Sequence, residues 1–252
     1  MIFLWKWLLR KLEAFGKFVL FSYDIVLRIF VGRLRLGLIY EQMVLVAIKS
    51  LPITIVTAIF VGMAFTIQIV REFMRFGADE MIGGIVGLAV WRELGPMMTG
   101  AVIAGRIGAA LASEIGSMKV TEQIEALEVL SQDPLRYLVV PRVIALTLMM
   151  PLLVTIADIC GFLSGLVVAL STGKITAVMY FNSADIMLRL SDLTGGLLKA
   201  FFFGLTISLI GCFFGLRTRE GARAVGESTK SSVVVCLITV FILNYILSTL
   251  IT

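Results

Sequence analysis

The sequence contains no histidine, and its 252 residues include only three cysteines and five prolines. Without histidine the chain cannot form a Ser-His-Asp triad, a histidine-ligated zinc or haem site, or a histidine proton relay. The cysteines Cys160, Cys212 and Cys236 lie far apart within apolar runs, so we interpret them as packing residues. We therefore predict a protein that is not an enzyme, with no catalytic residue, no metal site and no cofactor.

Charged side chains are also scarce. They make up 15% of the chain, whereas apolar residues make up 59% and the mean hydropathy is +1.02. A soluble domain has about 25% charged residues, so this chain has too few to cover a water-facing surface. This composition excludes a disordered chain, a nucleic-acid-binding arm and a secreted disulfide scaffold. It predicts an all-α polytopic membrane protein that does not bind nucleic acid.

Five apolar stretches are long enough to cross a bilayer core, which needs about 20 helical residues. We expect spans at about 50–72, 81–115, 136–172, 193–216 and 231–252. The second and third exceed the length of one perpendicular helix, so we expect them to tilt and to emerge from the membrane. In the fourth span we expect Lys199 to extend its ammonium toward the interface.

Basic residues are distributed unequally between the two sides of these spans. Fifteen lysines and arginines fall before the first span, between the second and third spans, or between the fourth and fifth spans, against five on the other side. Because cytoplasmic loops carry the excess of lysine and arginine, we predict a cytoplasmic N-terminus.

Residues 1–45 read as interfacial and elbow helices that precede the first span. From Lys6 to Arg35 the polar residues recur at helical spacing, and apolar residues such as Trp5 and Val19 occupy the other face. Charges are spread through the segment, unlike those of a signal peptide. We predict an amphipathic helix in the cytoplasmic interface, with a poor sixth span as the alternative.

Small residues recur every three or four positions within two of the spans. The two rows are Ala101, Gly105, Gly108 and Ala112, and Gly204, Ser208, Gly211 and Gly215. Small side chains allow helix backbones to approach closely in a membrane. We expect these rows to pack helices within one bundle or to form a contact between two copies of the chain.

We predict a short helix at about 118–131, in the connection between the second and third spans. Pro134 sets the end of this helix. Its apolar positions are Val120, Ile124, Leu127 and Leu130, and its acidic positions are Glu122, Glu125 and Glu128. An acidic face binds poorly to an anionic leaflet, so we expect this helix to dock on a partner protein. The chain itself has no phosphate loop, because neither Gly100–Gly105 nor Gly221–Gly226 is followed by the required lysine.

Three of the ionisable residues that interrupt the apolar stretches are candidate functional residues. Arg92 and Glu93 are adjacent, so they point about 100° apart on a helix and cannot pair well with each other. Each needs a partner on another helix, a lipid headgroup or solvent, and each is therefore a candidate functional residue. Asp158 lies in the middle of the third span, where we expect a helix-to-helix hydrogen bond or a proton path.

The segment from Trp91 to Ala145 carries a dense set of motifs. It contains R-E-L-G-P, A-G-R-I-G-A-A-L, E-I-G-S-M, T-E-Q-I, a D-P pair and a P-R pair, and V-G-M occurs earlier, at 61–63. In these motifs the chain resembles the MlaE (YrbE) family, the permease subunits of ABC transporters that move phospholipids between membranes. The resemblance covers essentially the whole chain.

The resemblance implies a homodimer that docks on a separate cytoplasmic ABC ATPase subunit and lies beneath an MCE-domain protein. It places a phospholipid between the two copies. The implied lipid-binding residues are Phe65, Phe73, Arg92 and Glu93, and the implied ATPase-coupling residues are Glu122, Gln123, Ile124, Glu125 and Leu127. Phe76 occupies a position where some relatives have tyrosine.

From the residues and the resemblance together we predict a lipid-transporting permease subunit in a cell inner membrane. A plastid or cyanobacterial envelope membrane is the alternative location. The alternative functions are a proton-coupled carrier of an apolar solute that uses Asp158, and a membrane-embedded lipid-modifying enzyme. The absence of histidine and of clustered aspartates argues against the enzyme.

Overall fold

A computed structural model of the chain describes residues 2–31, 35–171, 175–219 and 221–251, with side chains from Leu12 onward. The α-helices are α1 (Ile2–Val31), α2 (Leu36–Arg75), α3 (Ile82–Ala89), α4 (Gly95–Val120), α5 (Gln123–Val129), α6 (Val140–Ser171), α7 (Ala177–Met187), α8 (Leu190–Leu216) and α9 (Ala222–Ile251). A 3-10 turn spans Asp79–Met81, and π-helical turns span Val90–Leu94 and Leu135–Val139. The described residues contain no strand, and the predicted all-α fold is confirmed.

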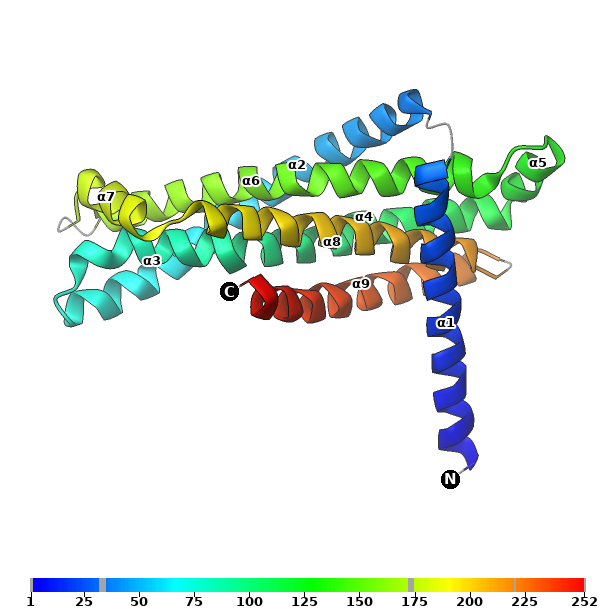
Figure 1. The fold of residues 1–252 in the computed structure, drawn as a ribbon, viewed down its shortest axis with the longest axis horizontal. Helices are drawn as coiled ribbons and strands as arrows, with labels where there is room; N and C mark the ends of the chain where they lie inside the picture. The colour runs from blue at the N-terminus through cyan, green and yellow to red at the C-terminus, as the bar shows by residue number, and fades with distance from the viewer. Residues whose placement is uncertain (1, 32–34, 172–174, 220, 252) are drawn as a thin grey trace.

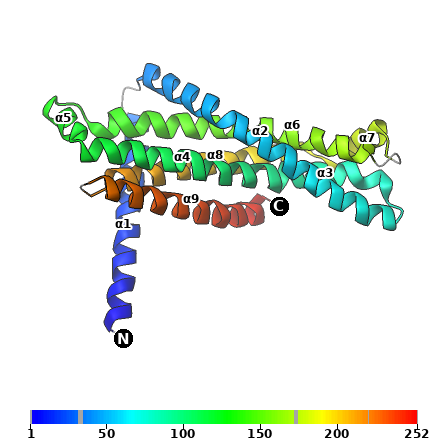
Figure 2. The same cartoon turned by 180° about the vertical axis from the view of Figure 1, so that it is seen from behind.

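Five helical segments are long and apolar enough to cross a membrane, as predicted. They are Leu36–Arg75, Asp79–Val120, Leu135–Ser171, Leu190–Leu216 and Ala222–Ile251. α4, α6, α8 and α9 run side by side, and α2 packs obliquely along α6 (Figures 1 and 2). α8 is central in the bundle. In an apolar stretch of 18 residues within each span, 61% is buried in α8, against 17% in α2 and 11% in α9.

The helix of the first span is longer than the sequence predicted. The predicted span begins near residue 50, whereas α2 begins at Leu36 and continues through Pro52 without a break. Glu41 and Lys49 lower the hydropathy of its first turns, so hydropathy alone misses this part of the helix. The N-terminal part of α2 extends away from the other helices in both views (Figures 1 and 2).

α1 stands crosswise to the spanning helices, at the end of the bundle that carries α5 (Figure 1). It contacts the bundle through Ile25, which is fully buried, and through Phe18 and Phe21, whose rings pack on Phe213 at 5.3 and 5.6 Å. Much of its remaining apolar surface is exposed, for example Leu20 and Phe30. This crosswise orientation is the one that an interfacial helix requires. The side chains of Trp5 and Lys6 lie outside the described residues.

Small residues hold the helices in close contact, as the sequence predicted for α8. A Cβ on Gly204 would lie 2.7 Å from the Leu146 carbonyl oxygen of α6, and one on Gly211 would lie 3.0 Å from Leu111 of α4. In α4 only part of the row makes such contacts. Gly108 faces Cys236 of α9, whereas a Cβ on Gly105 would have no neighbouring atom within 4 Å. The row on α8 therefore packs the bundle, and the row on α4 does so only in part.

The outer connection between the third and fourth spans contains α7, a helix that the sequence analysis did not predict. α7 packs on α3, where Gly83 and Gly84 allow its backbone to approach. The Ser183 hydroxyl accepts a hydrogen bond of 3.0 Å from the Gly84 backbone N–H. Tyr180 is buried there and donates to the Phe162 carbonyl oxygen at 3.1 Å. α7 thus closes the end of the bundle opposite α5.

From the contact between α2 and α6 we predict that a larger residue at position 62 destabilises the protein. A Cβ at this position would overlap the Gly161 carbonyl oxygen. We expect Gly62→Ala to lower the free energy of unfolding by about 1–3 kcal/mol, because the two backbones must separate. Thermal unfolding of the purified protein in detergent measures the change.

The control for this prediction is Gly226→Ala in α9, where a Cβ meets no atom within 4 Å. That substitution should be neutral or slightly stabilising, because alanine favours the helix. Equal stability of the two variants would show that the close α2–α6 contact is not required.

Candidate functional site: a buried charge cluster and the short helix α5

The local sequence around Arg92 and Glu93 deprives one backbone carbonyl of its usual helical hydrogen bond. Both residues lie in the π-helical turn Val90–Leu94, and Pro96 follows at the start of α4. Proline has no N–H, so the carbonyl oxygen four residues earlier, on Arg92, loses its α-helical hydrogen bond. Lys199 of α8 donates a hydrogen bond of 2.7 Å to this oxygen.

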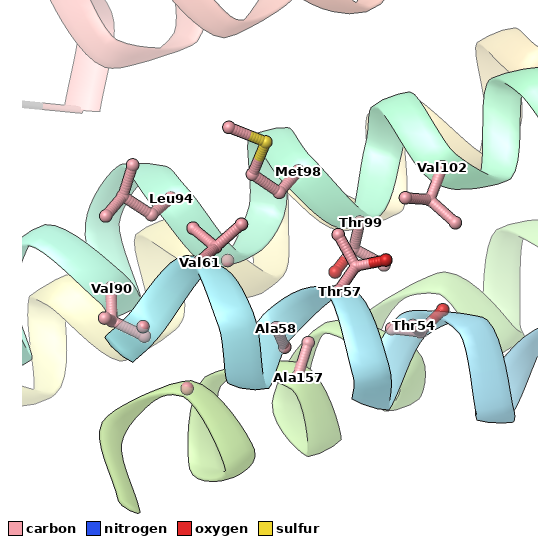
Figure 3. Close-up of a pocket in the computed structure, with 13 residues that line it drawn as sticks. Thr54, Thr57, Ala58, Val61, Val90, Leu94, Met98, Thr99, Val102 and Ala157 are labelled. Atoms are coloured by element: carbon pink, nitrogen blue, oxygen red, sulfur yellow. The ribbon is translucent and has the colours of Figure 1, made fainter. Parts of the chain in front are cut away.

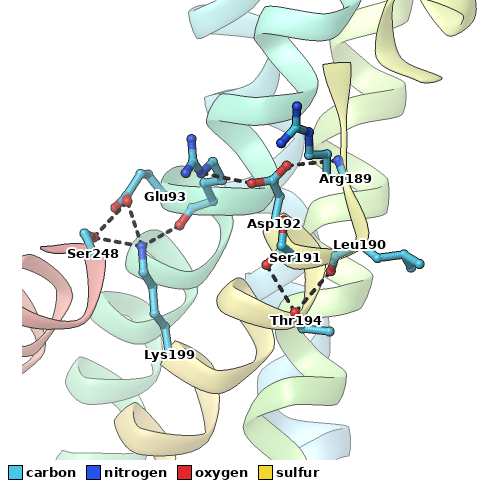
Figure 4. A network of polar contacts seen from close by, with 9 residues as sticks. Glu93, Arg189, Leu190, Ser191, Asp192, Thr194, Lys199 and Ser248 are labelled. Carbon is cyan, nitrogen blue, oxygen red and sulfur yellow. Dashed lines mark hydrogen bonds and ion pairs between the residues drawn. The ribbon is translucent and has the colours of Figure 1, made fainter. Parts of the chain in front are cut away.

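Lys199 is the centre of the cluster (Figure 4). Its ammonium also donates to Glu93 Oε1 at 2.7 Å and to Ser248 Oγ at 2.8 Å. An ammonium has three hydrogens to donate, and these three oxygens can accept them all. Lys199 is only 3% exposed. The prediction that it extends to the interface is wrong, because partners on two neighbouring segments bind it inside the bundle.

Glu93 extends the cluster to the last span. Its Oε1 also accepts a hydrogen bond from the Ser248 hydroxyl at 2.8 Å, and its Oε2 accepts one from the Asn244 amide at 2.9 Å. The carboxylate therefore joins the start of α4 to both α8 and α9. The expectation that Glu93 needs a partner on another helix is confirmed.

Arg92 pairs with a different acid. Its Nε lies 3.2 Å from Asp192 Oδ1 at the start of α8, and Asp192 Oδ2 accepts the Arg189 backbone N–H at 2.9 Å. The Arg92 side chain is 39% exposed, whereas that of Asp192 is only 10% exposed. Part of the guanidinium therefore still faces solvent, where it can meet an anionic group.

An open cavity of about 350 Å³ adjoins this cluster. The charged residues that line it are Arg92, Glu93, Arg189, Asp192 and Lys199. Three cations and two carboxylates face the same space, so the cavity has an excess of positive charge. It can hold a polar group that carries negative charge, such as a phosphate.

A second, much smaller cavity of about 20 Å³ lies between α2, α4 and α6 (Figure 3), and it has room for about one water molecule. Its lining is mainly apolar, with Val61 and Met98 among the residues, and Thr54, Thr57 and Thr99 add hydroxyl groups. Its lining suits a small apolar group better than a charged one.

Phe65 and Phe73, the two predicted lipid contacts, lie further along α2 than this cavity. Both are half-buried and pack on the apolar cluster that contains Val86 and Phe162. Phe76 is 82% exposed. The two predicted phenylalanines thus share one side of α2 near its C-terminal end, and their role in lipid binding stays a prediction.

Asp158 is buried in α6, with 2% of its surface exposed. Its Oδ1 has no hydrogen-bond partner among the described residues, so the expected helix-to-helix hydrogen bond is not found for this atom. The carboxyl instead packs against Gly95, where a Cβ would overlap it. Gly95 thus provides the space for the carboxyl next to the π-helical turn.

At the opposite end of the bundle, α5 is shorter than the predicted helix 118–131, because α4 continues to Val120. Its apolar side faces the bundle: Ile124 is 4% exposed and Leu127 packs partly on the main core. Glu122, Gln123 and Glu128 are exposed. Ile124 therefore holds α5 against the bundle, and the polar residues are the accessible ones.

Glu125 contacts the end of α4. The Lys119 ammonium donates a hydrogen bond to its carboxylate and lowers the pKa of that carboxyl. An open cavity of about 810 Å³ lies beside this pair. Thr218 and Arg219, from the turn between α8 and α9, line it together with Glu122. This groove was not predicted from the sequence.

The comparison with known proteins decides the family. Residues 39–250 match the family described as Permease MlaE. The chain belongs to the MlaE permease family. The resemblance inferred from the Trp91–Ala145 motifs is therefore confirmed.

Relatives of this MlaE permease match it along nearly its whole length. A probable ABC transporter permease protein of Synechocystis is 45% identical over 96% of this chain and 90% of that protein. One of Rickettsia typhi is 41% identical over 94% of this chain and 92% of that protein. The chloroplastic protein TRIGALACTOSYLDIACYLGLYCEROL 1 of Arabidopsis thaliana is 42% identical over 89% of this chain, which spans 64% of that protein.

From the charge cluster we predict that Lys199 is required for the stability of the fold. We expect Lys199→Met to destabilise the MlaE permease by about 1–3 kcal/mol, because Glu93 and the Arg92 carbonyl lose a buried donor. Thermal unfolding in detergent measures this loss.

The double variant Lys199→Met with Glu93→Gln tests the cause. Removing both charges should recover part of the stability, since no unpaired carboxylate remains. If the double variant loses as much as the two single variants added together, the two residues do not act as a pair.

Proposed function

We propose that this chain is the permease subunit of an ABC transporter that moves phospholipid or a similar lipid between membranes. The observation that carries the proposal is the membership of the MlaE permease family over residues 39–250. The relatives from Synechocystis and Rickettsia are named as probable ABC transporter permeases, which favours an ATP-driven system. The Arabidopsis relative has the name of a diacylglycerol lipid, which favours a lipid substrate.

The charged cavity fits one part of a phospholipid, because Arg92 and Arg189 suit an anionic headgroup. The apolar side chains around Val61 and Met98 offer the acyl chains a surface to pack on. Phe65 and Phe73 lie on α2, beyond the apolar cavity. In this proposal Arg92 meets the phosphate, and Glu93 keeps the neighbouring Lys199 neutralised.

The partners follow from the same proposal. α2 and α9 are the least buried spans, so their outer faces are free to contact lipid or a second copy of the chain. A homodimer would enclose the lipid between the two copies. A cytoplasmic ATPase would dock on α5, and an MCE-domain protein would receive or supply lipid on the other side. The membrane is a cell inner membrane or a plastid or cyanobacterial envelope.

The docking proposal predicts an effect of charge reversal on α5. We expect Glu122→Lys together with Glu128→Lys to abolish co-purification of the ATP-binding subunit, because both side chains are exposed on this helix. Affinity purification of the full chain from cells that express the whole transporter measures the bound ATPase.

The matched control is Glu13→Lys, an exposed acidic residue on α1 that pairs with Lys17. This change should leave the ATPase bound. An ATPase that remains bound after reversal at both Glu122 and Glu128 would contradict docking on α5.

The lipid proposal predicts that the half-buried phenylalanines of α2 retain lipid. We expect Phe65→Ala with Phe73→Ala to reduce the phospholipid that co-purifies with the protein by about fivefold or more, through the loss of apolar contact area. Mass spectrometry of extracted lipid measures it. Phe60→Ala is the control, because Phe60 is on the same helix but 66% exposed. Equal losses in both variants would contradict a specific pocket.

A proton-coupled carrier is the second candidate, because Asp158 is buried with an unpartnered Oδ1. It requires transport in vesicles without an ATPase, driven by a proton gradient and abolished by Asp158→Asn. Transport that depends on ATP and tolerates Asp158→Asn would exclude this alternative.

A further inference from the structure

Both ends of α5 are formed by residues in the left-handed backbone conformation. Glu122 has φ of 58° and Ser131 has φ of 57°, and they are the only residues other than glycine with positive φ in the described part of the chain. Left-handed turns on non-glycine residues are strained and occur often at switch regions. α5 is therefore a short separate helix between two sharp turns and does not continue α4.

The residues directly after Ser131 fix the start of the third span. Asp133 Oδ1 accepts the Leu135 backbone N–H at 3.1 Å, and its carbonyl oxygen accepts the Tyr137 backbone N–H at 3.0 Å. This side chain acts as a cap for the helical segment that begins at Leu135. Asp133 thus joins the segment after α5 to the first turn of the helix that leads into α6.

Two arginines that flank the connection between α1 and α2 bind this same short segment. Arg28 of α1 forms an ion pair with Asp133 Oδ2, and its Nε also lies 3.0 Å from Asp24. Arg35 donates a hydrogen bond of 2.7 Å to Gln132 Oε1. Its guanidinium lies over the Tyr137 ring, 5.1 Å from the ring centroid. These contacts join parts of the chain about a hundred positions apart.

We infer that Arg28 and Arg35 form a clamp that anchors the segment directly after α5 to α1 and to the start of α2. A short helix with two mobile ends absorbs a push by rotating at its flanking turns. When one end is held, the same push moves the attached helices. The clamp therefore transmits a displacement of α5 to α6 and α1. This inference rests on the proposed function, because an ATPase must push α5.

Asp133 has two roles, as a helix cap and as the ion-pair partner of Arg28, and a substitution can separate them. Asp133→Asn keeps an oxygen that accepts the Leu135 N–H, so the cap at the start of the third span is preserved. It removes the negative charge that binds Arg28. Arg28→Gln removes the other half of the ion pair, and Arg28→Lys keeps the charge. These variants therefore test the clamp without removing the cap.

The experiment uses the full transporter, with its ATPase, in phospholipid vesicles. For Arg28→Gln and Asp133→Asn we expect the ATPase to stay bound and to hydrolyse ATP. The amount of lipid moved per ATP hydrolysed should fall by about fivefold or more. A fivefold change is at the lower end of the coupling typically found between two sites in a protein. The double variant should be no worse than either single variant, because both remove the same ion pair. Arg28→Lys should recover most of the ratio.

The control pair is Arg223 and Glu227, an exposed ion pair of 3.2 Å within α9. Arg223→Gln should leave lipid moved per ATP unchanged. Additive losses in the double variant, an unchanged ratio in Arg28→Gln, or loss of the bound ATPase would each overturn the clamp. The two hypotheses fail in different ways. If the unsubstituted chain itself binds no ATPase, the proposed function is wrong, whereas the clamp is tested only by comparing the variants with that chain.

Discussion

The bundle depends on the pairing of one buried ammonium. Lys199 is placed among apolar helices, where an unpaired charge has a high free energy. Its three hydrogen bonds go to the Arg92 carbonyl, to Glu93 and to Ser248. One side chain thereby fixes α8 against the π-helical turn and against α9. The charged cavity exists because this cluster leaves Arg92 partly exposed beside it.

Close backbone packing allows these short polar contacts to form. Gly204 and Gly211 bring α8 against α6 and α4, and Gly62 brings α2 against α6. Larger residues would separate the helices and lengthen the hydrogen bonds of the cluster. The same packing places α8 at the centre and leaves α2 and α9 at the periphery. The peripheral helices therefore have the largest share of surface free for contacts outside the chain.

The two ends of the bundle have different chemistry. One end is closed by α7 and holds the charged cavity, and the other carries α5 with the exposed Glu122 and Glu128. The chain lacks a phosphate loop, so in the proposed transporter a separate subunit supplies the energy at α5. The contact of Arg28 connects that end to α1, and the contact of Arg35 connects it to the start of α2. A long helix such as α6 then links events at α5 to the opposite end.

The sequence by itself determined the class of the protein, its five apolar spans and its family. Hydropathy and the Trp91–Ala145 motifs are local properties, so they can be read without coordinates. It also showed that Arg92 and Glu93 need partners. Only the tertiary structure identified those partners, because Lys199 and Ser248 lie 106 and 155 positions from Glu93. Likewise the α1 clamp and the burial of Ile124 depend on how distant helices pack, which periodicity within one helix does not specify.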